Sequence, residues 1–575
     1  MFNVELILKK NYQNFYDKYP KIISAFVTHV FRSVLHEREI NDFMAQNVTK
    51  GIGFVEKILE SYNVSYSVKS SEIENIPALG SVVVISNHPL GGMDSLILLK
   101  MIADARHDKK VKIVANDMLM AVPALKDLLI PVNNIDGKIS KQSRKDIIDA
   151  LENEEAVIFF PSGEVSRASV TGIKKERWKS GFVKMARATN APILPIHLDA
   201  KNSWSFYLLS SVYKPFGTLL LSHEMLKPKQ KVIKPTIGEL IPNEAFNSRA
   251  MSPKEYTELF KKHLFRLSRG KQGVFMTQKC IAHPQLRHIL KAELQKAKLL
   301  GFTNDQKKIF LVDYDQAPSV MAEIGRLREF SFRKVGEGTG AKRDLDKFDS
   351  YYKHLVLWDE NDLEIVGAYR IGQTDDIIKK FTANGLYMNE LCHLEDSFLD
   401  IADKSVELGR SFVQPKYWGS RALDYLWQGI GAYLRAYPQV KYLYGPVSIT
   451  ASYPQAAKDV LVYFYRRYFK VEKNFFTAHN SYHCPSTQLK NFDEMFIGLD
   501  YKENLAILKE YLKNFDATVP TLYKQYSELC EEGGVSFSDF GLDEDFADCI
   551  DGYIMVNMDM VKSKKRERYF SKEDR

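Results

Sequence analysis

Apolar residues in the first half of the chain form short continuous runs separated by amphipathic segments. Residues 81–85, 111–115, 156–160 and 193–197 are mainly apolar and rich in β-branched side chains, as buried strands of a parallel sheet are. Apolar residues at helical spacing lie between these runs, at 96–103, 145–151 and 182–188. The alternation of strands and helices predicts an α/β domain over residues 76–245.

The residues before this domain, 1–75, are predicted to be mostly helical. Between residues 22 and 34, apolar side chains recur at intervals of three and four, the spacing of one helix face; they are Ile23, Phe26, Val27, Val30, Phe31 and Val34. Lys21 and Arg32 flank them. We expect the helix to pack on its own domain, and binding to a membrane surface is the alternative.

A different order of elements follows a basic, helical connector predicted over residues 246–305, with helices at 256–267 and 285–300. From residue 306 to 575 the pattern predicts strands at 309–312, 352–358, 365–370, 386–391, 405–412 and 440–445. Helices are predicted at 317–330 and 420–437. This mixed α/β domain differs from the first, so the two halves are different folds and not repeats.

Composition narrows the possible functions. The chain has 575 residues, more than one core normally holds, and a formal net charge of +8. Its five cysteines have no paired spacing, so we expect neither a metal site nor a disulfide framework. No apolar run is long enough to span a bilayer. We therefore expect a cytoplasmic protein, peripheral on the inner face of the membrane, whose charge favours anionic lipids or acidic proteins, with no nucleic acid partner.

The first candidate site follows the strand at 81–85. Asn87 and His88 come directly after it, and Asp94 follows a Gly91-Gly92 pair at the start of the next helix. Histidine titrates near neutral pH, and a neighbouring carboxylate fixes its tautomer and stabilises the imidazolium. His88 and Asp94 are therefore a candidate general base and its orienting partner.

Three further blocks stand at strand ends, where open α/β sheets bind their ligands: Phe160 to Arg167, Lys179 to Gly181, and Pro192 to Pro195. Together with Asn-His-x5-Asp they resemble the four blocks of the glycerolipid O-acyltransferase superfamily, which includes the 1-acylglycerol-3-phosphate acyltransferases. The resemblance covers residues 75–245. It implies that His88 deprotonates an acceptor hydroxyl for attack on an acyl thioester. The implied substrate-binding residues are Asn87, Gly163, Glu164, Arg167 and Lys179.

Two departures from that family concern the acceptor. The interval between His88 and Asp94 is one residue longer, which the two glycines can absorb in a tight turn. Ser162 and Val165 stand where the family has a glutamate and the arginine associated with the acceptor phosphate. We therefore expect an acceptor without a glycerol phosphate head, whose carboxylate pairs with Arg167.

The second half resembles another family. Arg326 to Phe330, Asp344 to Asp349, Glu364 to Arg370, Glu407 to Arg410 and Leu443 to Ser448 are similar to the GNAT-type N-acyltransferases that acylate ornithine or glycine. The resemblance covers residues 307–475. It implies a strand opening for the pantetheine arm, with Glu390 and Glu407 as base candidates on the two strands that frame it. Asp346 and Asp349 are candidates for holding the amine, and Arg410 for the substrate carboxylate or the donor phosphate.

The donor is expected to be an acyl carrier protein. Tyr417 and Trp418 stand where acetyl-CoA-dependent relatives have small or basic residues that cradle a pyrophosphate. A carrier protein presents a single phosphate, and the net positive charge suits its acidity. Acyl-CoA is the other possible co-substrate, and no further cofactor is expected.

The two resemblances together imply a bifunctional ornithine or glycine lipid synthase. The second domain would transfer a 3-hydroxyacyl chain to the amine of a small amino acid, and the first would acylate the free hydroxyl of that lyso-aminolipid. One alternative is a lysophosphatidate-type acyltransferase with a regulatory GNAT-like module. The other is a non-catalytic lipid-binding protein at the membrane surface.

Overall fold

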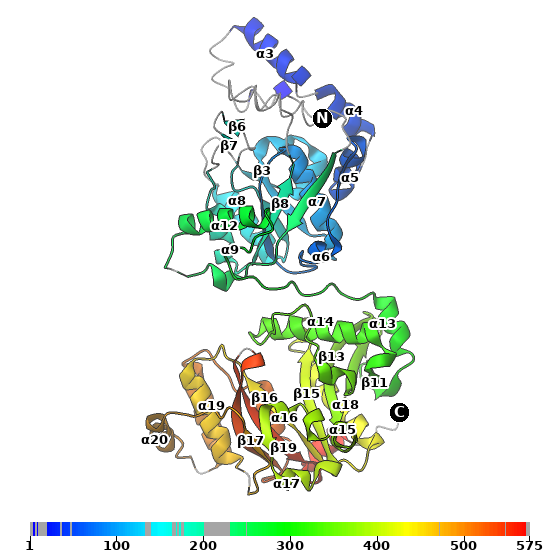
Figure 1. Ribbon diagram of the computed structural model, residues 1–575, viewed down its shortest axis with the longest axis vertical. Coiled ribbons are helices and arrows are strands. Elements are labelled where there is room, and N and C mark those ends of the chain that lie inside the picture. Colours follow the sequence, from blue (N-terminus) through cyan, green and yellow to red (C-terminus); the bar gives the residue numbers. More distant parts are fainter. Residues whose placement is uncertain are drawn as a thin grey trace. The chain divides into compact units, whose positions relative to one another are not determined.

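The computed structural model divides the chain into two compact units, Met1–His283 and Pro284–Arg575 (Figure 1). It describes residues 4–5, 9, 20–34, 37–46, 49–132, 140–163, 168–169, 172–173, 177–200, 231–248, 250–470, 472–498, 500–546 and 548–570. The stretch 246–305, predicted as a connector, is shared between the units. Its helix α12 (Pro253–Leu267) belongs to the first unit, and α13 (Arg287–Leu294) belongs to the second.

The first unit is built on a seven-stranded sheet with the order β1-β9-β8-β2-β5-β3-β4. β9 runs antiparallel to β8, and the central strands β8, β2, β5, β3 and β4 are parallel. The strands are β1 (Val64–Tyr66), β2 (Val82–Ser86), β3 (Val111–Asn116), β4 (Leu129–Val132), β5 (Ala156–Phe159), β8 (Ile193–Asp199) and β9 (Lys231–Ile237). The four predicted strands are confirmed; every residue of β2 is buried, whereas only Val111 and Ile113 of β3 are.

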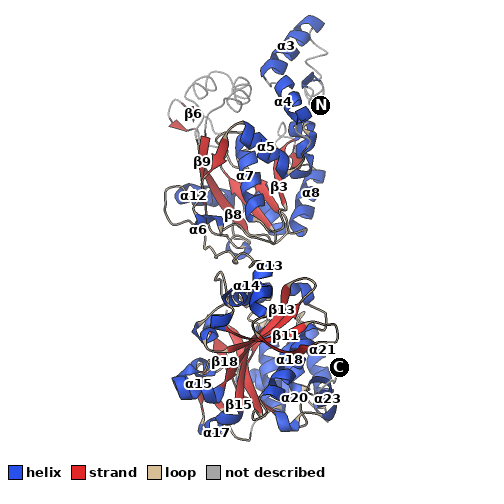
Figure 2. Cartoon of the chain, turned by 90° about the vertical axis from the view of Figure 1, so that its right-hand side faces the viewer, coloured by secondary structure: helices blue, strands red, loops and turns tan. Residues whose placement is uncertain are grey.

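Helices cover both faces of this sheet (Figure 2). α5 (Ile52–Ser61) and α7 (Gly92–Ala105) share one apolar core with Val82 and Val84, and α8 (Lys141–Glu152), α9 (Gly181–Ala188) and α12 share another with Val83 and Ile85. Burial on both faces explains why β2 is apolar throughout. Three further helices are α3 (Lys21–Val34), α4 (Glu37–Gln46) and α6 (Ser70–Ile73).

The second unit has an eight-stranded sheet with the order β10-β11-β12-β13-β15-β16-β19-β18. All neighbouring strands are antiparallel except β15 and β16, which are parallel. The strands are β10 (Lys298–Phe302), β11 (Lys308–Asp313), β12 (Lys353–Asp359), β13 (Glu364–Gln373), β15 (Ser405–Val413), β16 (Tyr442–Ile449), β18 (Val535–Asp543) and β19 (Cys549–Asn557). β14 (Cys392–Leu394) and β17 (Phe476–Ala478) form a separate pair.

The two faces of this sheet carry different residues. One face packs its apolar side chains against α18 (Ala422–Ala436), α19 (Gln455–Tyr468), α21 (Tyr501–Lys513) and α22 (Thr521–Ser527). The other lies under α14 (Pro318–Lys334), α15 (Thr374–Phe381), α16 (Met388–Leu391) and α17 (Asp396–Leu399), and it also holds buried charged groups. The remaining helices are α20 (Ser486–Met495) and α23 (Ser563–Tyr569).

Two predicted elements are wrong. The helix predicted at 285–300 ends at Leu294, and the apolar residues after it form β10, which pairs with β11 as an edge strand. The strand predicted at 386–391 contains α16 instead. Side chains take the backbone donors there, because Tyr387 N donates to Tyr352 Oη and Met388 N donates to Glu407 Oε1. These groups are therefore not available to a neighbouring strand.

Two candidate active sites

The first site is the turn between β2 and α7. His88 Nδ1 lies 3.1 Å from Asp94 Oδ2, so the two residues predicted to work together are in contact. The side chain of His88 is 16% exposed whereas that of Asp94 is fully buried. With Nδ1 directed to the carboxylate, Nε2 is the ring nitrogen left for a substrate. The geometry is that of a base held by a buried acid.

The glycine pair accounts for the longer interval between His88 and Asp94. Gly91 has φ +77°, a left-handed conformation that favours glycine, and α7 begins at Gly92. Asp94 Oδ2 also accepts hydrogen bonds from Leu90 N at 2.7 Å and Gly91 N at 3.1 Å. Burial raises the pKa of Asp94, while His88 and these amides act in the opposite direction. The turn at Gly91 thus accommodates the additional residue between His88 and Asp94 and directs two backbone amides to the Asp94 carboxylate.

Neighbouring residues fix the position of the histidine. Its ring stacks on Phe160, with ring centroids 3.9 Å apart. The side chain of Asn87 joins β2 to β8 through Leu198, donating to O at 2.9 Å and accepting from N at 2.7 Å. We conclude that Asn87 anchors the strand end from which His88 projects.

The block that follows β5 lies only partly within the described residues. Gly163 has φ +63°, and a Cβ built there would be 3.3 Å from Lys179 Nζ, so the glycine and the lysine lie side by side. Lys179 N also donates to Pro161 O at 2.8 Å. The structure therefore brings together two of the predicted substrate-binding residues. Glu164 and Arg167 lie outside the described residues.

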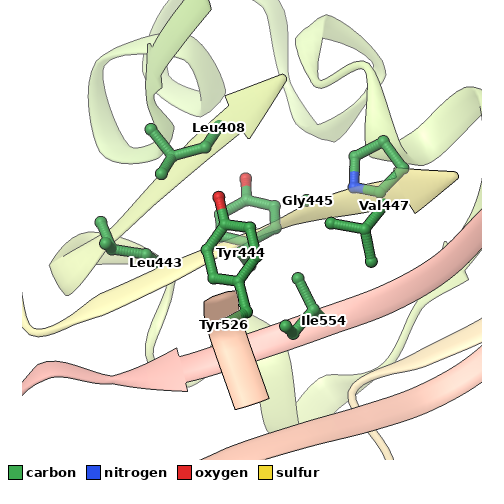
Figure 3. Close-up of a pocket in the computed structure, with 8 residues that line it drawn as sticks. Leu408, Leu443, Tyr444, Gly445, Val447, Tyr526 and Ile554 are labelled. Atoms are coloured by element: carbon green, nitrogen blue, oxygen red, sulfur yellow. The ribbon is translucent and has the colours of Figure 1, made fainter. Parts of the chain in front are cut away.

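The second site centres on the separation of β15 from β16. These strands pair only from Ser405 to Glu407 opposite Tyr442 to Tyr444. Beyond this point lies a pocket lined by Leu408, Leu443, Tyr444, Gly445, Pro446, Val447, Tyr526 and Ile554 (Figure 3). A Cβ on Gly445 would be 2.0 Å from Leu408 O, so only glycine fits where the strands diverge. The two parallel strands β15 and β16 thus separate here, whereas the prediction placed the opening between the strands that carry Glu390 and Glu407.

A bulge in β15 lies beside the opening. The pairing of β13 with β15 shifts by one residue between Ala368 and Arg370. Arg410, and not the glycine before it, carries the left-handed backbone, with φ +48°. A non-glycine residue in this conformation is uncommon and often marks a functional position. The bulge turns Arg410 toward Asp344 and Asp346, which lie 3.6 and 3.7 Å away.

Glu407 stands at the opening but is engaged on both oxygens. Tyr352 Oη donates to Oε2 at 2.7 Å, and Met388 N donates to Oε1 at 3.0 Å. Burial raises the pKa of Glu407 to about 7. This glutamate therefore holds Tyr352 and the start of α16 in place.

The free energy of unfolding should depend on pH because folding raises the pKa of Glu407. Such a group stabilises the fold fully below the pKa of the unfolded chain, and this stability is lost as the pH rises toward the folded pKa of about 7. We expect Glu407→Gln to remove this loss, which is on the order of 3 kcal/mol between pH 4.5 and 7. Calorimetric unfolding of the second unit across that range measures it. Parallel curves for the variant and the wild type would contradict the assignment.

Two buried arginines join the loop before β12 to its neighbours, one on α14 and one on β13. Arg328 Nη1 donates to Asp349 Oδ1 at 2.7 Å, and Arg370 Nη1 donates to both oxygens of Asp346 at 2.7 Å. Burial and the Arg328 guanidinium lower the pKa of His354 to about 4, so the ring is neutral; Arg328 Nη2 lies 3.3 Å from its Nδ1. Asp346 and Asp349 thus bind arginines of the protein itself.

Glu390 is paired at the surface. It sits on α16 with its side chain 45% exposed, and it pairs with Lys347 at 2.6 Å. Its predicted place on a strand framing the opening is wrong. Arg328 and Arg370 belong to the motifs described above but were not predicted as site residues. The sequence does carry a signal for Arg370, because a charged residue within an otherwise apolar strand must be paired when the strand is buried.

The described residues contain no group of three or more acidic, histidine or cysteine side chains placed to hold a metal ion. A search of the same residues for helices long and apolar enough to cross a bilayer finds none.

Comparison with known proteins identifies both units. Residues 17–268 match the family described as Acyltransferase, and residues 327–428 match the Acetyltransferase (GNAT) domain. A glycine N(alpha)-acyltransferase of Bacteroides thetaiotaomicron is 32% identical over 50% of this chain and 89% of the relative. A lyso-glycine lipid O-acyltransferase of that organism is 32% identical over 44% of this chain and 93% of the relative.

More distant similarity extends to ornithine enzymes. An L-ornithine N(alpha)-acyltransferase of Brucella abortus is 26% identical over 44% of this chain and 87% of the relative. Each of these relatives is matched over most of its own length but accounts for half of this chain or less. The chain therefore belongs to the acyltransferase families of its glycine N(alpha)-acyltransferase and lyso-glycine lipid O-acyltransferase relatives, with an Acyltransferase domain in its first unit and a GNAT domain in its second.

Proposed function

We propose that the chain makes a phosphorus-free aminolipid by two successive acyl transfers. The second unit joins a 3-hydroxyacyl chain to the α-amine of an amino acid. The first unit then esterifies the hydroxyl of this lyso-aminolipid with a second acyl chain. The observation that carries the proposal is the fusion of two units whose separate relatives are named for N-acylation of glycine and O-acylation of lyso-glycine lipid.

The geometry of the first site supports the O-acyl transfer. His88 Nε2 takes the proton of the lipid hydroxyl, and the oxygen attacks the thioester carbonyl. Asp94, 3.1 Å from Nδ1, stabilises the imidazolium that results. As the C–O bond forms and the C–S bond breaks, the imidazolium returns the proton to the departing thiolate. The products are an ester and a free thiol.

The opening between β15 and β16 supports the N-acyl transfer. The apolar residues Leu408, Leu443, Val447 and Ile554 line the small pocket there, so an acyl chain that entered the opening would meet apolar side chains. We propose an acyl carrier protein as donor, because Tyr417 and Trp418 occupy the loop before α18 where a pyrophosphate would otherwise need small residues. The enzyme needs no resident cofactor for this chemistry.

Glycine is the favoured amino acid, and ornithine is the second candidate. The glycine N-acyltransferase relative is 32% identical, whereas the ornithine relative is 26% identical over a similar share of the chain. We also propose that the protein works at the inner face of the cytoplasmic membrane, where its lipid product belongs. Ile22 and Phe26 of α3 are 83% and 68% exposed, which suits contact with lipid.

The test is a reconstitution of the purified chain with 3-hydroxyacyl carrier protein and a second acyl carrier protein. Separate reactions receive isotope-labelled glycine, labelled ornithine or lysophosphatidate, and mass spectrometry identifies the lipids. We expect a labelled diacylated lipid from glycine. Acylation of lysophosphatidate alone would overturn the proposal in favour of a glycerophospholipid acyltransferase.

The order of the two steps has its own test. Without an amino acid, neither product should form, and synthetic N-(3-hydroxyacyl)-glycine should restore the ester product. An ester formed on the free 3-hydroxyacyl thioester before any amino acid is added would reverse the order.

A further inference from the structure

The hairpin of β18 and β19 places a second carboxylate group beside the opening of the second unit. Asp551 of β19 lies opposite Ser448 of β16, whose Oγ donates to Asp551 Oδ1 at 2.6 Å. Ser448 follows Gly445 by three residues, so Asp551 lies within about 10 Å along the strand of the point where β15 and β16 part. Side chains alternate along β16, and Ser448 therefore shares the face of Tyr444, the residue opposite Glu407.

Asp551 is buried but not fully engaged. The residue is 2% exposed, and within the described part of the chain the bond from Ser448 is the only hydrogen bond to its carboxylate. Burial and the nearby Asp543 carboxylate raise the pKa of Asp551 to about 7. Other groups that interact electrostatically with it are Glu337, Arg410, Tyr387, Tyr523, Cys549 and Tyr553. A carboxylate poised near neutral pH with a free oxygen suits proton transfer.

Arg410 provides a cation in the same group of charges. Its guanidinium lies 5.0 Å from the ring centroid of Tyr387 and 4.9 Å from that of Phe546. Its ionic contacts with Asp344 and Asp346 are 3.6 and 3.7 Å long, and its buried Nε has no hydrogen-bond partner. Among the described residues, no acceptor lies within ordinary hydrogen-bond distance of this guanidinium. It is therefore a largely buried cation, with its side chain 14% exposed, able to accept a carboxylate ligand.

The hairpin of β18 and β19 also holds the two aromatic side chains that lie beside the Arg410 guanidinium, Tyr387 and Phe546. Tyr387 Oη donates to Asp543 Oδ2 at 3.2 Å, and Asp543 Oδ1 accepts from Phe546 N at 3.1 Å. Asp543 thereby fixes both aromatic residues that flank Arg410. Glu407 is less suited to meet a substrate amine, because Tyr352 Oη and Met388 N already engage its two oxygens.

We propose that Arg410 and Asp551 form the amino acid subsite of the second unit, with Arg410 binding the α-carboxylate and Asp551 receiving the α-ammonium group. The inference rests on the N-acyl transfer proposed above. Asp551 takes one proton from the ammonium, and the neutral amine attacks the thioester carbonyl. The C–N bond forms, the C–S bond breaks, and the second N–H proton goes to the departing thiolate. Ser448 and Asp543 are positioning residues.

The experiment compares the full chain with Asp551→Asn, Arg410→Gln and Ser448→Ala in N-acylation of glycine. We expect Asp551→Asn to lower kcat/KM for glycine by about 100-fold or more and to abolish the rise in rate through pH 7, with the KM for the thioester unchanged. Ser448→Ala should shift that rise to higher pH, because its hydrogen bond favours the ionised carboxylate. Asp551→Asn with the wild-type glycine KM and pH profile would overturn the subsite.

Binding of glycinamide distinguishes the role of Arg410 from that of Asp551, because glycinamide keeps the amine of glycine but lacks the carboxylate that Arg410 binds. Arg410→Gln should weaken glycine binding, measured by calorimetry, at least tenfold and leave glycinamide binding unchanged. Equal loss for both ligands would contradict the role of Arg410. If glycine binds in this way but no amide forms, the proposed function fails and the subsite stands. If the wild-type chain does not bind glycine, the subsite fails.

Discussion

Replacing His88 with alanine is expected to lower the rate of O-acylation by about 10³-fold, the range found when a general base is removed. The side chain is reachable, stacks on Phe160, and is held by the buried Asp94 at 3.1 Å. N-acylation depends on the other unit and should keep its wild-type rate. The lyso-aminolipid should therefore accumulate, which mass spectrometry of the reaction measures directly.

Asp94→Asn is the matched variant for this experiment. An asparagine keeps an oxygen for the amides of Leu90 and Gly91 but no longer stabilises the imidazolium. We expect a smaller loss of O-acylation than in His88→Ala and no change in KM for the lyso-aminolipid. Full ester formation in His88→Ala would show that another group takes the hydroxyl proton.

The first site could be predicted closely because its chemistry is local in sequence. His88 and Asp94 are separated by one turn, and a strand that is apolar throughout followed by two glycines leaves little freedom in where that turn lies. The structure confirms their contact at 3.1 Å. The role of Asn87 is harder to predict from the sequence, since its partner Leu198 lies 111 residues away on β8.

The second site depends on contacts that no local pattern specifies. Arg328 meets Asp349 across 21 residues, and Ser448 meets Asp551 across 103 residues through the pairing of β16 with β19. Motifs located Asp346, Asp349, Glu407 and Arg410 in the sequence but not their partners. The two aspartates thus appeared free to hold a substrate amine, whereas the fold gives them arginines of the protein itself.

Glu390 illustrates the same limit. An apolar run with β-propensity suggested a strand, but the backbone donors before it are taken by Tyr352 and Glu407, residues brought there by β12 and β15. Tertiary hydrogen bonds decided the local structure. The side chain of Glu390 consequently points to a surface lysine and not into the opening.

Asp349→Ala is expected to destabilise the second unit by roughly 3–5 kcal/mol, the cost of removing one partner of a buried ion pair. Arg328 is fully buried, and its bond to Asp349 is 2.7 Å long. Without that carboxylate, Arg328 keeps only the 3.3 Å contact with neutral His354 as its side-chain partner among the described residues. Arg370 still has Asp346, so the damage centres on α14.

Calorimetry should record this loss as a fall of roughly 10 °C in the unfolding temperature of the second unit. Glu390→Ala is the matched control, because it breaks an ion pair of 2.6 Å whose side chains are 45% and 66% exposed, and exposed pairs contribute about 1 kcal/mol or less. Equal losses in the two variants would mean that burial does not determine the strength of the Arg328 pair.

The stability of the protein at low pH gives an independent test of the Arg328–Asp349 ion pair. The Arg328 and Arg370 guanidiniums hold the pKa of Asp349 below its ordinary value of 3.8. A group whose pKa is lowered by folding contributes its full stability above the unfolded pKa and loses it as pH falls toward the folded value. The gap in stability between wild type and Asp349→Ala should therefore be constant near neutral pH and narrow below about pH 4. A gap that stays constant in acid would assign the loss to packing and not to the charge.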